Sequence, residues 1–182
     1  MPTIEVSVRR VSVVSSRPFD EVVQRLTATI GHPDMSAFHN ALAAATTAAE
    51  LEDVVHRATG SSNLMEFVRF DAGDVLRKAC GGHGPQILRL VVGNPLIMKE
   101  MAKTVPDAAA YAPITILVDE RADGVHLSYD SMASLIAPYG SEQLSPLPGS
   151  STRRSSQCSK RRPCPSEYEA APNAIANEHN DI

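Results

Sequence analysis

The stretch ITILVDERADGVHLSY, residues 114–129, decides the fold class of this chain. Its first part is a β-rich apolar run, and apolar and polar side chains alternate from Val125 to Tyr129. Asp123-Gly124 lies between the two parts and is typical of a tight turn. We therefore expect an antiparallel hairpin. Because helices and strands are intermixed in the rest of the chain, this hairpin favours an α+β fold over a doubly wound α/β fold.

Apolar spacing and cap residues predict the remaining elements. Gly31 follows an apolar helical stripe and is expected to end that helix in the left-handed conformation. The apolar phase shifts after Arg9-Arg10, which predicts a β-bulge in the first strand. The predicted strands are residues 4–13, 65–70 and 86–92, and the predicted helices begin near Ser16, Met35, Thr47, Asp71, Asn94 and Asp130.

Composition indicates one soluble domain. The net charge is −4, and residues 1–140 hold 12 Lys or Arg against 16 Asp or Glu. They show no basic stripe, so nucleic acid is not an expected partner. No segment approaches the roughly 20 apolar residues of a membrane span, and the start has no signal-peptide pattern. Three cysteines are too few and too badly spaced for a disulfide framework, so we expect a cytoplasmic protein.

The composition changes after Gly140. Residues 141–182 contain eight Ser and five Pro and show no apolar periodicity, which predicts a disordered tail. The domain is therefore assigned to residues 1–140. An alternative interpretation is that the tail is aberrant: back-translation of residues 145–163 with a two-nucleotide shift gives an amphipathic helix, as expected of an out-of-frame peptide.

Four segments together resemble the domain of unknown function 302 family of bacterial and archaeal proteins. They are VRRVSVVSSRPFDEVVQRL (8–26), SNLMEFVRFD (62–71), ILRLVVGNPLIMKEM (87–101) and DAAAYAPITILVDERADGVHLSYDSMASLIAPYG (107–140). The resemblance covers most of residues 1–140. It implies a strand, a helix and a multistranded antiparallel sheet with helices on one face, a plan like that of TATA-binding protein, and it makes a homodimer plausible. It implies no agreed activity, and the helix that ends typical members is missing after Gly140.

Four residues are candidates for ligand contact: Arg89, Asn94, Arg121 and His126. Arg89 interrupts a strand that is expected to be buried on both faces, where a charge needs a partner. That partner is either a ligand carboxylate or phosphate, or a carboxylate of the domain, with Asp71, Asp119 and Glu66 as the choices. Asn94 precedes Pro95 at a helix start, where an anion could bind, although capping alone explains both residues.

Catalytic and metal motifs are weak in this sequence. His126 and Ser128 share one face of the hairpin with Asp119 nearby, but alternation alone places polar residues there and no nucleophile elbow exists. Cys80 and His83 have the spacing of two metal ligands without a second pair. We therefore predict no metal and no cofactor.

The leading hypothesis is a non-catalytic domain that binds a small ligand or a partner, with a small-molecule or anionic ligand possible. It is expected to form a homodimer by its sheet or by an exposed apolar helix face. The alternative is an enzyme of unknown reaction with a cleft around Arg89, Asn94, Arg121 and His126. Convergent polar groups with perturbed pKa values would favour the enzyme, and an apolar groove would favour binding.

Overall fold

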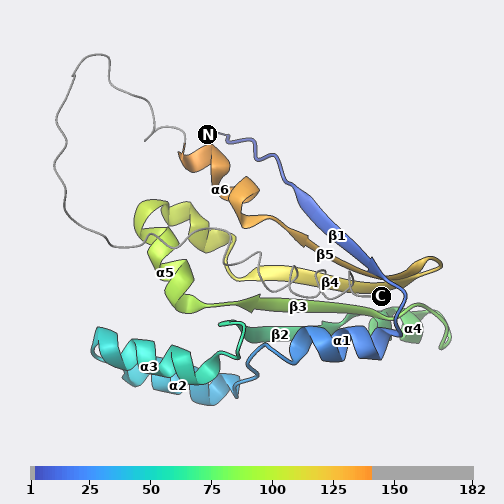
Figure 1. Ribbon diagram of the computed structural model, residues 1–182, viewed down its shortest axis with the longest axis horizontal. Helices are drawn as coiled ribbons and strands as arrows, with labels where there is room; N and C mark the ends of the chain where they lie inside the picture. The colour runs from blue at the N-terminus through green and yellow to red at the C-terminus, as the bar shows by residue number, and fades with distance from the viewer. Residues whose placement is uncertain (1–2, 141–182) are drawn as a thin grey trace, which may run out of the picture.

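The computed structural model describes residues 3–140, which form a five-stranded antiparallel sheet flanked by helices (Figure 1). The strand order is β1-β5-β4-β3-β2. The strands are β1 (Arg10–Ser15), β2 (Met65–Asp71), β3 (Ile87–Gly93), β4 (Ile114–Arg121) and β5 (Gly124–Asp130). The helices are α1 (Phe19–Thr27), α2 (Met35–Ala44), α3 (Ala48–Ala58), α4 (Ala72–Ala79), α5 (Pro95–Thr104), the 3₁₀ helix η1 (Pro106–Ala110) and α6 (Met132–Gly140). The predicted tail, residues 141–182, lies outside the described residues.

The predicted hairpin and the α+β class are confirmed. Strands β4 and β5 pair antiparallel, with Asp119 opposite His126 and Arg121 opposite Gly124. Gly124 has a φ of 136°, a backbone conformation that residues other than glycine rarely adopt. Ala122 and Asp123 make the tight connection between β4 and β5, and Gly124 is the first residue of β5.

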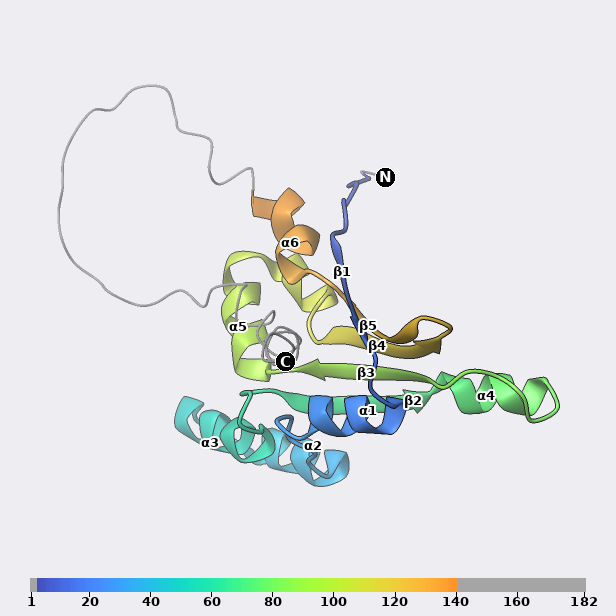
Figure 2. The ribbon, with the colours of Figure 1, turned by 45° about the vertical axis from the view of Figure 1, so that its right-hand side comes forward.

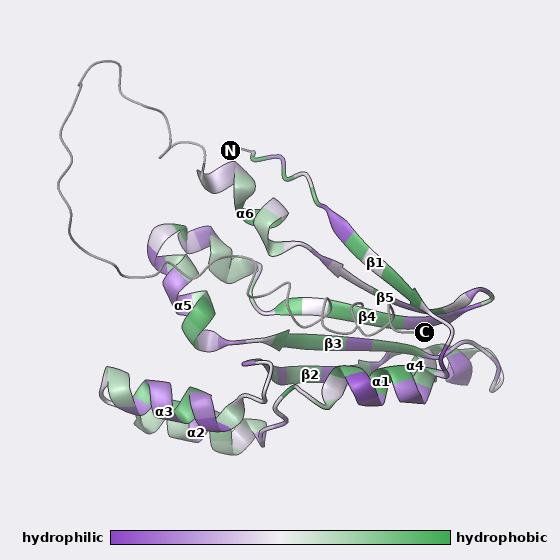
Figure 3. Cartoon of the chain, viewed as in Figure 1, coloured by the Kyte–Doolittle hydropathy of each residue, from purple (hydrophilic) through white to green (hydrophobic). Residues whose placement is uncertain are grey.

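One face of the sheet carries most of the core. Alternate residues of β3, β4 and β5, such as Leu90, Ile116 and Leu127, pack there against Val22 and Leu26 of α1. Figure 3 shows β3 and β4 mostly green, while α1 carries bands of both green and purple. An amphipathic helix on an apolar sheet face explains this pattern.

Several helix starts follow the predicted caps. Thr47 and Glu50 form the predicted capping box, because the Glu50 amide donates to Thr47 Oγ1 and the Thr47 amide donates to Glu50 Oε2, each over 3.2 Å. Hydrogen bonds from Thr46 and Thr47 lower the pKa of Glu50. Asp71 caps α4 by accepting from the Asp74 amide over 2.6 Å. These interactions are local, so residue type and spacing were sufficient to predict them.

Two strand predictions are corrected. Strand β1 begins at Arg10, and the residues from 3 to 9 lie outside any strand. Its partner β5 ends at Asp130, which faces Arg10 and accepts two hydrogen bonds from its guanidinium, so earlier residues have no strand to pair with. The bulge lies in β2 between Glu66 and Val68 instead.

One helix start is also corrected. Asp130 is the last residue of β5 rather than the cap of α6, which begins after Ser131.

Gly31 and Gly60 form a neck at the base of the α2–α3 hairpin. Both amides donate to the Leu64 carbonyl over 2.9 Å, and Glu66 N donates to Gly31 O over 2.8 Å. A methyl group added to Gly31 would overlap the Ala58 carbonyl oxygen and lie 2.8 Å from Gly60 N. The predicted left-handed helix end at Gly31 is therefore wrong, since Gly31 is not among the residues with positive φ. Glycine is required here by the close approach of two chain segments.

The ends of the sheet differ in what lies beside them. The α2–α3 hairpin and α5 lie at one end, and α4 lies at the opposite end (Figures 1 and 2). Phe38 of α2 and Val55 of α3 form a second, smaller core with Met65 of β2. In the described part of the chain, no helix is long and apolar enough to cross a membrane.

We predict that Gly31→Ala lowers the free energy of unfolding by about 2 kcal/mol or more, because the methyl group forces two hydrogen-bonded segments apart. Urea unfolding followed by circular dichroism measures this change. Ser61→Ala, at an exposed position beside Gly60, is the matched control and should change little. If Gly31→Ala instead stabilises the protein by about 0.4–1 kcal/mol, the usual effect of alanine at an unhindered glycine, then the two segments are not in close contact at Gly31.

Candidate functional site

The second face of the sheet carries three of the four predicted residues. Strand pairing places Phe70, Arg89, Leu117 and Ser128 in one row across β2, β3, β4 and β5. A neighbouring row runs through Ile87, Asp119, His126 and Val14. Apart from Met65 at the α2–α3 end, side chains of this face stay outside the two core clusters. On this face Phe70, Arg89 and Val14 are exposed, whereas Asp119, His126 and Ser128 are each 8% exposed.

Arg89 is exposed, not buried as the sequence predicted. One side of β3 is buried, whereas on the other side Ile87 and Val91 are half-buried and Arg89 is exposed. Arg89 Nη2 donates to Thr115 Oγ1 over 3.5 Å. Within residues 3–140, none of the expected partners Asp71, Asp119 and Glu66 forms an ion pair with Arg89. The guanidinium is therefore available to a ligand.

A cavity of about 490 Å³ lies beside Arg89. Its walls are Val91 and Thr115 of the sheet, the segment 109–113, Asp130 at the end of β5 and Leu135 of α6. The lining combines aliphatic side chains with a comparable share of polar surface, and Arg89 and Asp130 provide one charge of each sign. Asp130 already accepts both hydrogen bonds from Arg10, which lowers its pKa and keeps it ionised. Arg89 is thus the group with unused hydrogen-bonding capacity.

A tyrosine pair joins η1 to α6 near this cavity. The hydroxyl groups of Tyr111 and Tyr139 lie 2.7 Å apart, and their rings are tilted by 52°. The hydrogen bond to Tyr111 raises the pKa of Tyr139 to about 12. The Tyr139 hydroxyl therefore remains neutral near pH 7, and the contact fixes α6 against the cavity wall that includes Tyr111.

Arg121 and His126 lie at the tip of the β4–β5 hairpin. Arg121 forms a two-pronged ion pair with Asp119, whose second contact spans 3.2 Å from Nη2 to Oδ1. Nε2 of the buried His126 lies 2.9 Å from Oδ1 of Asp123, and this contact lowers the pKa of Asp123. Each basic side chain already has a carboxylate partner from its own hairpin. The cluster is accounted for by stabilisation of the turn.

Asn94 is 2% exposed and caps α5. Its Oδ1 accepts from the Leu96 amide over 2.8 Å, and its Nδ2 donates to the Asn63 carbonyl over 2.9 Å and to Asn63 Oδ1 over 3.1 Å. Asn63 has a φ of 60°, so this brace fixes an unusual backbone conformation just before β2. Asn94 therefore joins the start of α5 to the loop that enters β2.

The four predicted residues do not share one cleft. Asn94 follows the last residue of β3, whereas Arg121 lies at the far end of the antiparallel neighbour β4. Six or more residues of strand separate these ends, which is roughly 20 Å at about 3.4 Å per residue. Arg89 lies between them on the second face. The predicted pair Cys80 and His83 is exposed, and residues 3–140 contain no cluster of His, Cys, Asp and Glu suited to a metal ion.

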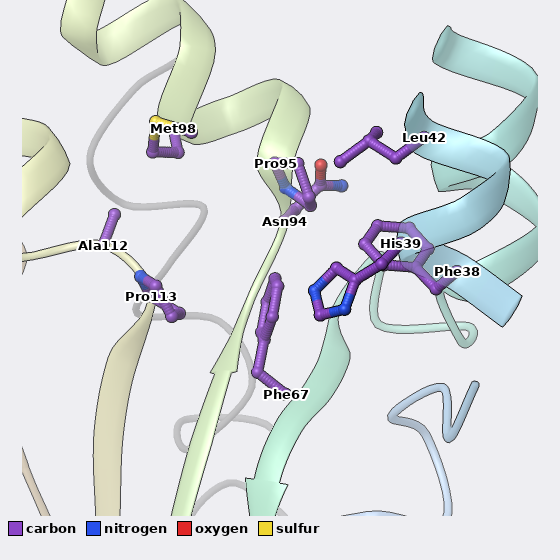
Figure 4. Close-up of a pocket in the computed structure, with 9 residues that line it drawn as sticks. All are labelled: Phe38, His39, Leu42, Phe67, Asn94, Pro95, Met98, Ala112 and Pro113. Atoms are coloured by element: carbon purple, nitrogen blue, oxygen red, sulfur yellow. The ribbon is translucent and has the colours of Figure 1, made fainter. Parts of the chain in front are cut away.

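The structure also contains an apolar pocket that sequence reasoning missed (Figure 4). It has a volume of about 190 Å³ and lies between α2, the start of α5 and the start of β4. Phe67, the extra residue in the β2 bulge, points into it together with His39. A bulge re-aims one side chain of a strand, so Phe67 leaves the usual alternation. No local sequence signal marks this bulge.

Comparison with protein families shows a match over residues 41–155, more than half of the chain, to the family described as domain of unknown function DUF302. The match extends past Gly140, so the predicted domain boundary stays a prediction. The fold is also similar to the crystal structure of an uncharacterized conserved protein DUF302 from Bacillus stearothermophilus. That protein is 11% identical, with a TM-score of 0.48 over 92% of this chain and 90% of that chain. Comparison with curated proteins gives no match.

Proposed function

This chain belongs to the DUF302 family, whose description names no activity, and from that premise we propose a non-catalytic domain that binds a small anionic molecule beside Arg89. The observation that carries the proposal is a guanidinium at the wall of a cavity of about 490 Å³ without an ion-pair partner in the described part of the chain. An arginine fork binds carboxylate or phosphate oxygens with two parallel hydrogen bonds.

The rest of the cavity wall supports an anion that has a small apolar body. Val91, Leu135 and Ala110 offer aliphatic surface next to the charge of Arg89. Asp130 carries the opposite charge but is held by Arg10, so it repels a second carboxylate and limits where the anion lies. The combination favours a monoanion over a polyanion.

The titratable groups of this region are poorly suited to proton transfer near neutral pH. The guanidinium of Arg10 lowers the pKa of Asp130, and the hydrogen bond to Tyr111 raises the pKa of Tyr139 to about 12. A general acid or base works best with a pKa near the working pH. These shifts move both groups away from that range, which supports binding without chemistry.

We predict that the protein binds butyrate or inorganic phosphate and that Arg89→Gln weakens this binding about tenfold or more. The loss corresponds to a hydrogen bond with a charged group, worth about 1.5–3 kcal/mol. Isothermal titration calorimetry with each probe measures the affinity and separates a carboxylate from a phosphate preference. Arg121→Gln removes an arginine that is already paired with Asp119 and serves as the control. Equal weakening by both substitutions would contradict the proposal.

We further propose that α4 contributes to a homodimer contact. This helix is amphipathic, yet among its residues only Gly73 is buried. Val75 and Leu76 are 55% and 39% exposed, and Phe70 at the end of the neighbouring edge strand β2 is 49% exposed. Apolar side chains gathered at a sheet edge and on one helix are typical of a surface that another chain covers. A second copy offers the same patch, as a two-fold symmetric contact requires.

We predict that Leu76→Glu shifts the protein toward monomer, because the contact would bury a carboxylate at its centre. Sedimentation velocity over a concentration series measures the shift. Lys78→Gln changes an exposed residue of the same helix that is paired with Asp74 and should leave association unchanged. A wild-type chain that stays monomeric at every concentration would rule out this contact.

A further inference from the structure

The pocket in Figure 4 is formed by elements that are distant in sequence but tightly braced. Phe38, His39 and Leu42 of α2 form one wall, and Met98, Ala112 and Pro113 form the opposite wall. Phe67 of the β2 bulge stands between the two walls. The pocket is separate from the cavity beside Arg89, although both reach Ala112 and Pro113.

The bracing keeps this space open without a ligand. The neck at Gly31 and Gly60 fixes where α2 leaves the sheet, through the two hydrogen bonds to Leu64 O. Asn94 fixes the start of α5 through its bonds to Asn63. Phe38 is 6% exposed and packs into the smaller core, so its ring cannot turn away from the pocket. A preformed pocket avoids the free-energy cost of ordering loops around a ligand.

The polar groups of the pocket restrict the chemistry of its ligand. Both polar atoms of the Asn94 side chain already form hydrogen bonds, since Oδ1 accepts from the Leu96 amide and Nδ2 donates to Asn63. A ligand that competed for this side chain would uncap α5. His39 is the other polar side chain of the wall, and its contact in the structure is a ring contact with Phe38, at 6.0 Å between centroids. His39 is exposed, and its ring nitrogens can accept or donate one hydrogen bond at the mouth of the pocket.

The volume matches one ring. An apolar cavity of about 150 Å³ is large enough to bind benzene, and this pocket measures about 190 Å³. Phe38 and Phe67 offer ring faces and edges for stacked or edge-to-face contacts, and the Met98 thioether adds a favourable sulfur–ring contact. The wall has no charged side chain that could pair with an ionic ligand, apart from the titratable imidazole of His39.

We propose that this pocket binds a single neutral aromatic ring bearing one hydroxyl or N–H group, which hydrogen bonds to His39. The ring lies between the wall of α2 and the wall formed by Met98 and Pro113. This site differs from the anion site in that neither Arg89 nor Asp130 lines it, although the two share Ala112 and Pro113.

Phenol and benzene are the probes, and the experiment is an NMR titration of the full chain. We expect saturable shifts at Phe67, Met98 and Leu42 with both compounds. His39→Ala should weaken phenol binding roughly threefold to tenfold more than it weakens benzene binding, because both lose the same wall contact but only phenol loses a hydrogen bond. His56→Ala, at an exposed histidine of α3, is the matched control and should affect neither. His39 is exposed, so its replacement leaves the core intact.

Three outcomes would overturn the proposal. They are the absence of saturable shifts at the pocket residues with both probes, an equal effect of His39→Ala and His56→Ala on phenol binding, and cyclohexanol binding as tightly as phenol. Cyclohexanol has the same ring size and hydroxyl group without aromatic faces, so it isolates the contribution of the rings. Butyrate, added as a competitor, should leave the phenol shifts in place, which separates this site from the one beside Arg89.

Discussion

The carbonyl oxygen of Leu64 accepts hydrogen bonds from both Gly31 and Gly60, and the position of the α2–α3 hairpin depends on this contact. A carbonyl oxygen has two lone pairs, so both are used here. The chain leaves the sheet at Gly31 and returns at Gly60, and the two segments approach so closely that neither position has room for a methyl group. A loop of almost thirty residues is thereby closed at its base. The hydrogen bonds to Leu64 O offset the entropic cost of bringing the two ends of this loop together.

The neck also determines which side chains line the apolar pocket. Because it places α2 beside the bulge of β2, Phe38 and His39 meet Phe67 across a small pocket. Asn94 extends the same brace to α5 through Asn63. The cavity beside Arg89 shares Ala112 and Pro113 with this pocket and is also lined by residues of the sheet, η1 and α6. The described part of the chain thus has an apolar pocket near the hairpin and a cavity with charged side chains on the sheet, and both are lined by Ala112 and Pro113.

The sequence predicted the local features well. The β4–β5 turn, the Thr47–Glu50 capping box and the Asn94 cap each depend on residues within a few positions of one another, so residue type and spacing identify them. The α+β class followed from the hairpin. The ligand role of Arg89, Asn94, Arg121 and His126 stays a prediction, although the structure separates these residues along the sheet.

The features that sequence analysis missed are non-local. Position 31 requires glycine because the segment around Gly60 passes too close for a methyl group. In the sequence, a glycine after a helix looks the same whether it adopts a positive φ or only makes room for another segment. Arg89 was expected to be buried because β3 is apolar on both sides, yet burial depends on what covers each face. The bulge at Phe67, and with it the place of Phe67 in the pocket that His39 also lines, requires the register of β2 against β3, which no short motif encodes.

Native-state hydrogen exchange of the Gly31 and Gly60 amides tests the central claim most directly, because both amides donate to Leu64 O. If the neck holds the hairpin to the sheet, both amides exchange as slowly as the most protected amides of β3 and β4, and with the same opening free energy as each other. If the two amides exchange as fast as the amide of exposed Ser61, the neck does not hold the hairpin to the sheet and some other contact does.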